Sequence, residues 1–172
     1  MRTLDVGERD KAIRLFASEI GAQQIGLAYH RPQEGLRSLQ CVSNVVEYTK
    51  SVGGAVRLGW YFVAKLSEEF GFYLVATHHA VWHDPKTEAL VDITPFHKDR
   101  SHHPVTFEGD VIFAVDDNAK PYMSGNRIVP LPLKFYPIQF NDGLKEYTQI
   151  LQQDELLAYD KQHGSKFSSD QK

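Results

Sequence analysis

The sequence predicts an α+β domain in which two helices precede an antiparallel β-sheet and one helix follows it. Three observations predict this class. Apolar residues recur at helical spacing near both ends of the chain, and the central segments are rich in Val, Leu, Tyr, Phe and Trp. Turn residues separate those central segments closely enough for neighbouring strands to pair as hairpins.

The helices are predicted from apolar spacing and from the residues that begin and end them. Ser38 is the expected N-cap of the second helix, and Gly53-Gly54 should end it. Asn141 or Asp142 should cap the third. The expected helices cover residues 10–20, 38–51 and 141–162.

The strands are predicted from short apolar segments bounded by turn signals. The turn Asp84-Pro85-Lys86-Thr87 should join the second and third strands as a hairpin. Residues 26–40 are expected to form a loop with one short strand at most, and residues 121–140 to form edge strands and loops. The expected strands cover residues 55–63, 72–82, 89–94 and 107–115.

The chain of 172 residues has the usual length of one domain, without an internal repeat or a linker-like stretch. We expect residues 1–163 to form that domain and residues 164–172 to form a flexible polar tail. The formal charge of −3, with no block of like charges, disfavours a nucleic-acid partner.

Localisation is predicted from features that the sequence lacks. No apolar run approaches the ~18 residues of a membrane span, so no membrane partner is expected. The first 20 residues mix charged and apolar side chains, which is not the pattern of a secretory signal. We expect a cytoplasmic protein, although delivery into another cell by a secretion machine would leave no mark on the sequence.

Cys41, the single cysteine, falls in the first turn of the second predicted helix. Amides that point out of a helix N-terminus lower the pKa of a thiol there, as does a nearby imidazolium. The same free N–H groups can stabilise the oxyanion of an acyl-transfer intermediate. The alternative is that Cys41 is a small buried hydrophobic residue, which is the commonest fate of a lone cysteine.

His79 and Asp92 lie on the two strands of the predicted hairpin. Asp92 is a charge inside an otherwise apolar strand and therefore needs a partner. With the turn centred near Lys86, His79 should lie roughly across from Asp92. The carboxylate of Asp92 would then orient the imidazole of His79. A structural hydrogen bond between the two side chains is the alternative.

These segments resemble the core of the transglutaminase-like proteins, a papain-like superfamily of cysteine enzymes. The resemblance runs from Cys41 to Pro95, about a third of the chain, with departures at Val81 and in the order of Thr94 and Pro95; the tryptophan often found beside the cysteine is missing. The segments that carry it are Cys41 at a helix start, Gly53-Gly54, Val56-Arg57-Leu58-Gly59-Trp60, His79-Ala80-Val81-Trp82 and Val91-Asp92-Ile93-Thr94-Pro95.

The resemblance implies a papain-like α+β fold in which the helix that carries the cysteine packs on an antiparallel sheet. It also implies thiol chemistry on an amide: hydrolysis, deamidation or transfer to an amine. Members of the superfamily without the chemistry exist, so an inactive binding module of the same fold is the first alternative.

Several further residues are candidates for the substrate or oxyanion site. Gln40 directly precedes Cys41, and Gln33 lies in the preceding loop, so either amide could donate to an oxyanion. Asn44 shares a helix face with Cys41, and Trp82 is a candidate for the wall of a cleft.

The remaining histidines raise a metal-dependent hydrolase as a second alternative. His79 and His83 have i, i+4 spacing, which on a strand separates them by about 13 Å, too far for one ion. A solvated polar loop is the simpler explanation of the other histidines. A metal site there would use His97, His102, His103 and Asp99.

We therefore expect a cysteine hydrolase or acyltransferase with a protein or peptide substrate and no cofactor. Cys41 would attack the amide, His79 would serve as base and then as acid, and Asp92 would orient His79. The backbone N–H of Cys41 would contribute to the oxyanion hole. His78, which points to the opposite face of the same strand, is the alternative base.

Overall fold

A computed structural model describes residues 3–164 of the protein. The tail expected at residues 164–172 lies outside the described residues except for Gly164, which ends the last helix. The helices are α1 (Val6–Glu19), α2 (Cys41–Val52) and α3 (Asp142–His163), with a 3-10 turn, η1 (Arg100–His102). Among the described residues, none of the helices combines the length and apolar character needed to cross a bilayer.

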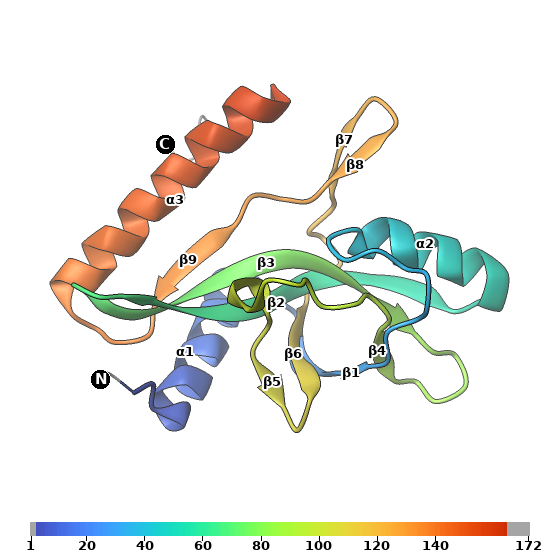
Figure 1. The fold of residues 1–172 in the computed structure, drawn as a ribbon, viewed down its shortest axis with the longest axis horizontal. Helices are drawn as coiled ribbons and strands as arrows, with labels where there is room; N and C mark the ends of the chain where they lie inside the picture. The colour runs from blue at the N-terminus through green and yellow to red at the C-terminus, as the bar shows by residue number, and fades with distance from the viewer. Residues whose placement is uncertain (1–2, 165–172) are drawn as a thin grey trace.

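The prediction of a mixed α+β fold with a mostly antiparallel sheet is confirmed. Seven strands form the main sheet, and two more form a separate hairpin that projects beyond it (Figure 1). The main sheet comprises β1 (Gln24–His30), β2 (Ala55–Ser67), β3 (Gly71–His83), β4 (Leu90–Asp92), β5 (Thr106–Phe107), β6 (Asp110–Val115) and β9 (Lys134–Pro137). The hairpin comprises β7 (Tyr122–Ser124) and β8 (Arg127–Val129).

The loop with one short strand expected at residues 26–40 is present: β1 covers Gln24–His30, two residues earlier than expected, and residues 31–40 form the loop. The first residues of β1 pair antiparallel with β6, and Tyr29 and His30 pair parallel with β4. The strands β1, β4, β3, β2 and β6 therefore close on themselves. Ile25, Leu27 and Tyr29 face outward and are exposed, whereas Ala28 faces inward and is fully buried in a core cluster.

The hairpin of β2 and β3 is the longest pairing in the sheet. Its register runs from Ala55 opposite His83 to Ser67 opposite Gly71, so the connecting turn is shorter than the polar segment expected at residues 66–71. This register places Tyr61 and His79 on one face of the hairpin and Leu58 and Ala80 on the other.

Helix α2 packs on the face of the hairpin that carries Leu58 and Ala80. Cys41, Val42 and Val45 contact these residues in one buried cluster. The helix starts at Cys41 rather than at Ser38, because Leu39 adopts a φ of 63° and Gln40 is the residue before the first turn. The nucleophile candidate is consequently the first helical residue.

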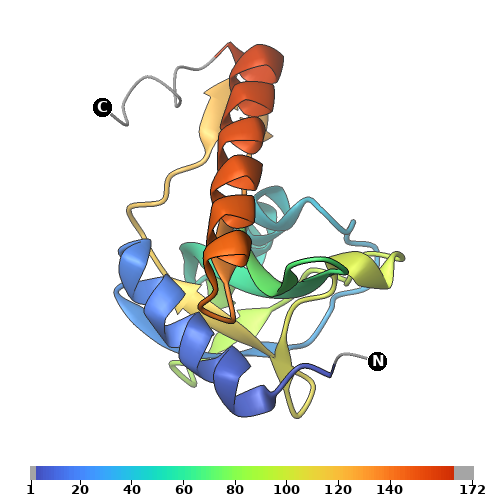
Figure 2. The same ribbon diagram turned by 90° about the vertical axis from the view of Figure 1, so that its left-hand side faces the viewer.

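Helices α1 and α3 lie toward the other end of the sheet from α2 (Figures 1 and 2). Helix α1 begins earlier than expected because the carboxylate of Asp5 accepts a hydrogen bond from the backbone N–H of Glu8. Helix α3 begins after Asn141, as predicted, and packs along β9. The end of α3 extends past the sheet toward the β7–β8 side of the molecule (Figure 1).

Candidate active site

Cys41 occupies the tip of α2, where the sulfur is nearly buried. The residue is 6% exposed and is the single cysteine of the chain. The first intrahelical hydrogen bond runs from Asn44 N to Gln40 O at 2.8 Å. The backbone N–H groups of the first turn, including that of Cys41, therefore have no partner within the helix and are available to an anion.

His79 lies beside Asp92, as the sequence predicted, but in a different register. Pairing of Trp82 with Val91 and of His83 with Leu90 makes Asp92 a diagonal neighbour of His79, two residues from the expected position directly across. Diagonal neighbours in antiparallel strands are close enough for long side chains to touch. His79 Nε2 and Asp92 Oδ1 are 3.1 Å apart, and both side chains are buried.

The contact of His79 with Asp92 is an ion pair rather than an aligned hydrogen bond. The Nε2–H group does not point along the line to the carboxylate, although the two atoms are within bonding distance. Oδ1 of Asp92 also accepts a hydrogen bond from Thr94 N at 3.0 Å, which fixes the carboxylate. Because Nε2 faces Asp92, the ring nitrogen that remains for the thiol is Nδ1.

The thiol and the imidazole each favour the charged form of the other. Burial opposes the thiolate, but the charge of His79 and a hydrogen bond with its side chain outweigh it, so the pKa of Cys41 is lowered. The backbone of Ala80 contributes in the same direction. Burial likewise opposes the imidazolium, yet Asp92 and Cys41 raise the pKa of His79 to about 10. Both shifts favour the form of the pair in which the thiol is deprotonated and the imidazole is protonated.

Two aromatic rings hold the imidazole from the sides. Tyr61 contacts it edge to face with ring centroids 4.8 Å apart, and Phe113 does so at 6.3 Å. Burial, with the nearby Cys41 and Asp92, raises the pKa of Tyr61 to about 12, so its hydroxyl stays protonated. Sequence reasoning missed Tyr61; it shares a strand face with Gly59, which pairs with His79, so the hairpin register was the available signal.

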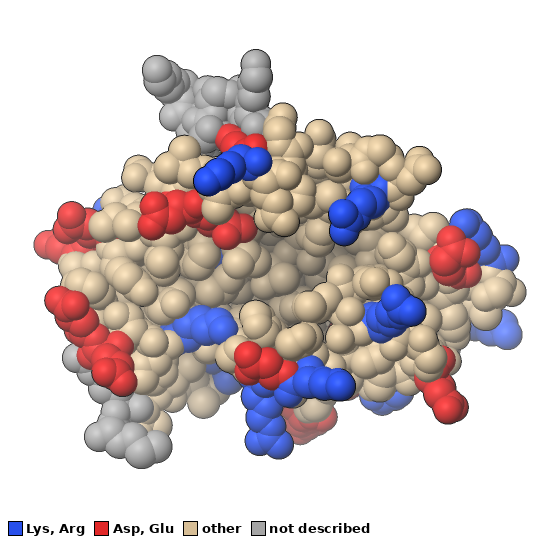
Figure 3. Space-filling view, turned by 45° about the horizontal axis from the view of Figure 1, so that its top comes forward, with Lys and Arg blue, Asp and Glu red and all other residues tan. Residues whose placement is uncertain are grey.

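Cys41, His79 and Asp92 line a groove of about 310 Å³. One wall is built from residues 94–104, and the other from the strand end Val129 with residues 130–133 and the end of α3. The face in Figure 3 is hollowed across its middle, and uncharged atoms border the hollow while charged side chains surround it. The groove lining is likewise mostly uncharged. Besides Cys41, His79 and Asp92, the residues that line the groove include Leu39, Tyr61, Thr77, Phe96, Pro104, Pro130, Leu131 and Tyr159.

The predicted substrate- or oxyanion-site residues Gln40, Asn44 and Trp82 do not line this groove. The amide of Asn44 donates to Arg37 O at 2.8 Å and to Thr94 Oγ1 at 3.2 Å, which commits both of its N–H groups. Trp82 packs against Tyr48, and its indole N–H donates to Gly53 O at the far end of α2.

The two candidate glutamines of the preceding segment have structural roles or point to solvent. Gln40 is exposed and makes no side-chain cap to the helix. Gln33 donates from its side chain to Arg31 O at 3.2 Å. The backbone N–H groups at the start of α2, which lack partners within the helix, remain candidates for an oxyanion site.

His78, the alternative base, also lines the groove, but both of its ring nitrogens have backbone partners. Its Nε2 bonds to Ala119 O at 2.7 Å, and its Nδ1 accepts from Leu131 N at 3.3 Å. Burial lowers the pKa of His78 to about 4, so the ring is neutral and joins two loops to the sheet. The geometry thus favours His79 over His78 as the partner of Cys41.

The histidine-rich loop contacts itself rather than forming a ligand set. His97 and His102 pack edge to face at 5.1 Å, and His103 bonds to His97 O. Asp99 caps η1 by accepting from Ser101 N. Within residues 3–164, three or more His, Cys, Asp or Glu side chains do not gather in a group that could hold a metal ion.

At Cys41, a thiol, an imidazole and a carboxylate come together from one helix tip and two strands, and all three line a groove. Such a set can attack a carbonyl carbon and hold the resulting oxyanion at the helix start. Comparison with known protein families, with curated proteins and with solved structures found no match to this chain.

Proposed function

We propose that the protein is a cysteine-dependent hydrolase or acyltransferase with a papain- or transglutaminase-like arrangement, acting on an amide or isopeptide bond. The observation that carries the proposal is the convergence of Cys41, His79 and Asp92 at one groove, with the pKa of the thiol lowered. A lowered thiol pKa in a cleft is typical of reactive rather than structural cysteines.

The proposed reaction has two halves. The Cys41 thiolate attacks the amide carbon, and the backbone N–H groups at the start of α2 stabilise the oxyanion. The carbon–nitrogen bond breaks as the His79 imidazolium gives its proton to the departing amine, which leaves a thioester on Cys41. Water or an acceptor amine then attacks the thioester while His79 takes its proton, and the thiolate departs. Asp92 supports the imidazolium throughout.

Casein together with dansylcadaverine tests this proposal, because each of the three possible reactions gives a product that can be detected. Casein supplies peptide bonds and glutamine side chains, and dansylcadaverine supplies an acceptor amine. Hydrolysis yields new amino termini, deamidation yields ammonia, and transfer yields fluorescent casein. We expect one of the three products with the wild-type protein and none with Cys41→Ala, which removes one buried sulfur and should fold. Turnover by Cys41→Ala would refute the proposal.

A binding module of the same fold is the second candidate, and one observation favours it. Cys41 is only 6% exposed, so access to the sulfur depends on the groove. The binding module predicts a thiol that resists iodoacetamide near pH 7, whereas the enzyme predicts rapid labelling. Because Cys41 is the single cysteine, the mass of the intact labelled protein reports on it alone.

A further inference from the structure

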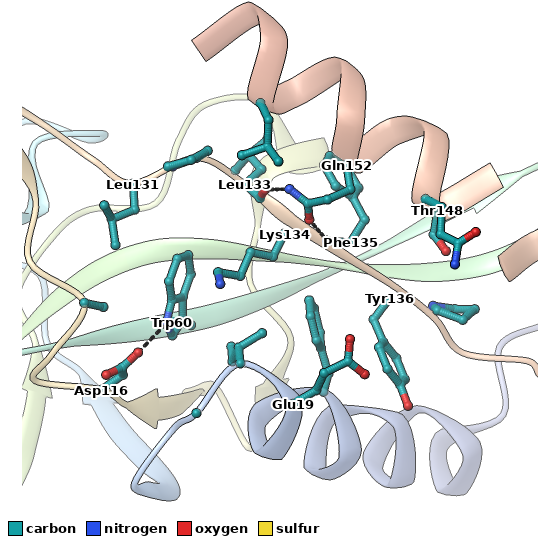
Figure 4. Close-up of a pocket in the computed structure, with 18 of the residues that line it drawn as sticks. Glu19, Trp60, Asp116, Leu131, Leu133, Lys134, Phe135, Tyr136, Thr148 and Gln152 are labelled. Atoms are coloured by element: carbon teal, nitrogen blue, oxygen red, sulfur yellow. Dashed lines mark hydrogen bonds between the residues drawn. The ribbon is translucent and has the colours of Figure 1, made fainter. Parts of the chain in front are cut away.

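A second cavity, of about 980 Å³, lies between α1 and α3 above β9 (Figure 4). The short segment of residues 131–133 separates it from the groove, since Leu131 and Leu133 line both. Cys41, His79 and Asp92 do not line it, so the proposed reaction leaves the cavity without a role. Its volume falls within the ~300–1,000 Å³ that small-molecule sites occupy.

The ammonium group of Lys134 projects into this cavity from β9 (Figure 4). Lys134 Nζ lies 5.2 Å from the centroid of the Trp60 ring, which stabilises the charge from one side. Among residues 3–164 it has no hydrogen-bond acceptor and no ion-pair partner. Burial lowers the pKa of Lys134, against the opposing charges of Asp116 and Glu19. A partly desolvated ammonium without a hydrogen-bonded counterion is costly.

Two of the polar side chains around Lys134 are committed elsewhere, while the carboxylate of Glu19 also lines the cavity and its charge favours the ammonium form of Lys134. Asp116 accepts from the Trp60 indole at 3.2 Å through one oxygen and from Asn118 N at 3.2 Å through the other. Gln152 bridges the backbone of β9, donating to Leu133 O and accepting from Phe135 N. These bonds shape the cavity but leave the three N–H donors of the lysine to whatever enters it.

The walls beside the ammonium are aromatic. Phe16 and Tyr136 stack with ring centroids 5.0 Å apart, and Trp60 forms the floor with 1% exposure. Phe140 stands at the cavity with 70% exposure, a large apolar surface left open to solvent. Apolar walls with a few placed polar or charged groups are the usual composition of a small-molecule site. The charged residues that line this cavity are Glu19, Asp116, Lys134 and Lys145.

We propose that this cavity binds a small organic carboxylate, with its anionic group on Lys134 and a ring-sized apolar body against Phe16, Trp60 and Tyr136. The unpaired ammonium selects the charge of the ligand, and the aromatic walls select its body. The carboxylate would accept two or three N–H bonds in a site shielded from water, where such charge-assisted bonds are strongest.

The test uses the full chain and two matched probes, 2-naphthoate and its neutral amide, 2-naphthamide. Titration calorimetry should give a saturable 1:1 isotherm for naphthoate, at least about ten-fold tighter than for the amide. Lys134→Gln should abolish this preference and Lys134→Arg should retain it. Lys50→Gln, on the exposed face of α2, is the charge-matched control and should bind like the wild type.

Equal binding of the two probes by the wild-type protein, or no saturation within their solubility, would overturn the proposal. So would a preference for naphthoate that survives in Lys134→Gln. The wild-type comparison needs no variant, so the proposal stays testable even if Lys134→Gln fails to fold. Cys41→Ala should bind naphthoate like the wild type, which separates this site from the proposed reaction.

Discussion

At the scale of single residues, the charges of Cys41 and His79 depend on each other. Burial of either charge alone would be unfavourable, and burial is the largest influence on both groups. The two shifts run in opposite directions because each group supplies the counterion of the other, with Asp92 as a third charge. The pair titrates as a unit, and removing one member should change the titration of the other.

This dependence predicts how Cys41 alkylation varies with pH. In the wild-type protein the rate with iodoacetamide should already be high at pH 7 and fall on acidification, as the thiolate is protonated. In His79→Ala, burial of the thiol dominates and its pKa rises, so labelling at pH 7 should fall by about ten-fold or more. The measurement is the rate of mass gain of the intact protein across pH 5–10.

His83→Ala is the matched control, because His83 lies four residues along the same strand and pairs with Glu88 near the turn. It should label at the wild-type rate. Wild-type labelling of His79→Ala at pH 7 would mean that the imidazole does not ionise the thiol.

The Asp92→Asn variant tests how much the proposed orienting carboxylate contributes to turnover, because asparagine keeps the shape of the side chain and loses its charge. Without Asp92 the imidazolium loses its largest support, so the pKa of His79 falls from about 10. Turnover, by whichever product the casein assay reveals, should fall about a thousand-fold or more. The alkaline limb of the pH–rate profile should also move to lower pH. Turnover within a few-fold of wild type would remove Asp92 from the proposed site.

At the scale of elements, the position of α2 decides where the thiol lies. Asn44 ties the first turn of this helix to Arg37 in the preceding loop and to Thr94 after β4. Thr94 N in turn bonds to Asp92, so a single chain of contacts connects the helix tip with the orienting carboxylate. Asn44 therefore acts as a brace for the site rather than as a donor within the groove.

Asn44→Ala should destabilise the protein by about 2–3 kcal/mol, because it leaves the buried hydroxyl oxygen of Thr94 and the part-buried carbonyl of Arg37 without this donor. Urea unfolding followed by circular dichroism measures this change. Ser51→Ala, at the exposed far end of α2, is the control and should shift the free energy of unfolding by less than about 0.5 kcal/mol. A near-zero cost for Asn44→Ala would show that the brace is dispensable.

Local patterns predicted the helices and the long hairpin because each depends on neighbouring residues. Cys41 at a helix start and Asp92 in an apolar strand were visible in the same way. The sequence indicated a short strand within residues 26–40 but not its pairing with β4 and β6, because those partners lie far along the chain. Nor could it predict the start of α2, where Leu39 takes a left-handed conformation. Asn44 and Trp82 were misplaced as groove candidates because helix-face and strand-face patterns do not say which polar partners a side chain finds.

At the scale of the whole molecule, segments far apart in the sequence build both the groove at Cys41 and the cavity at Lys134. The wall opposite residues 94–104 comes from the end of α3 and the segment after β8, so the groove forms only when the C-terminal third docks on the sheet. The hydroxyl of Tyr159 on α3 donates to Pro130 O at 2.8 Å, and Gln152 holds β9 to the same helix. His78, on β3, also holds the C-terminal third to the sheet, because its Nδ1 accepts a hydrogen bond from Leu131 N.

His78 should make the global stability of the protein depend on acid. Its folded pKa of about 4 lies below the ordinary value of 6.5, so the unfolded chain binds more protons between these values. Stability from the neutral ring is therefore present above pH 6.5 and is lost as the pH falls toward 4. The loss should not exceed about 1.4 kcal/mol per pH unit for this one group. Chemical unfolding at pH 4.5–7.5 measures the wild-type protein against His78→Gln, which cannot titrate.

The quantity to compare is the difference between the two free energies of unfolding, because carboxylates titrate in both proteins and cancel. This difference should be largest at pH 7 and shrink on acidification, since the wild-type protein alone must protonate or expel a buried ring. His102→Gln, on the exposed turn η1, is the control for the loss of a surface histidine. A difference for His78→Gln that stays level across this range would mean that His78 is not held neutral by the two loops it joins.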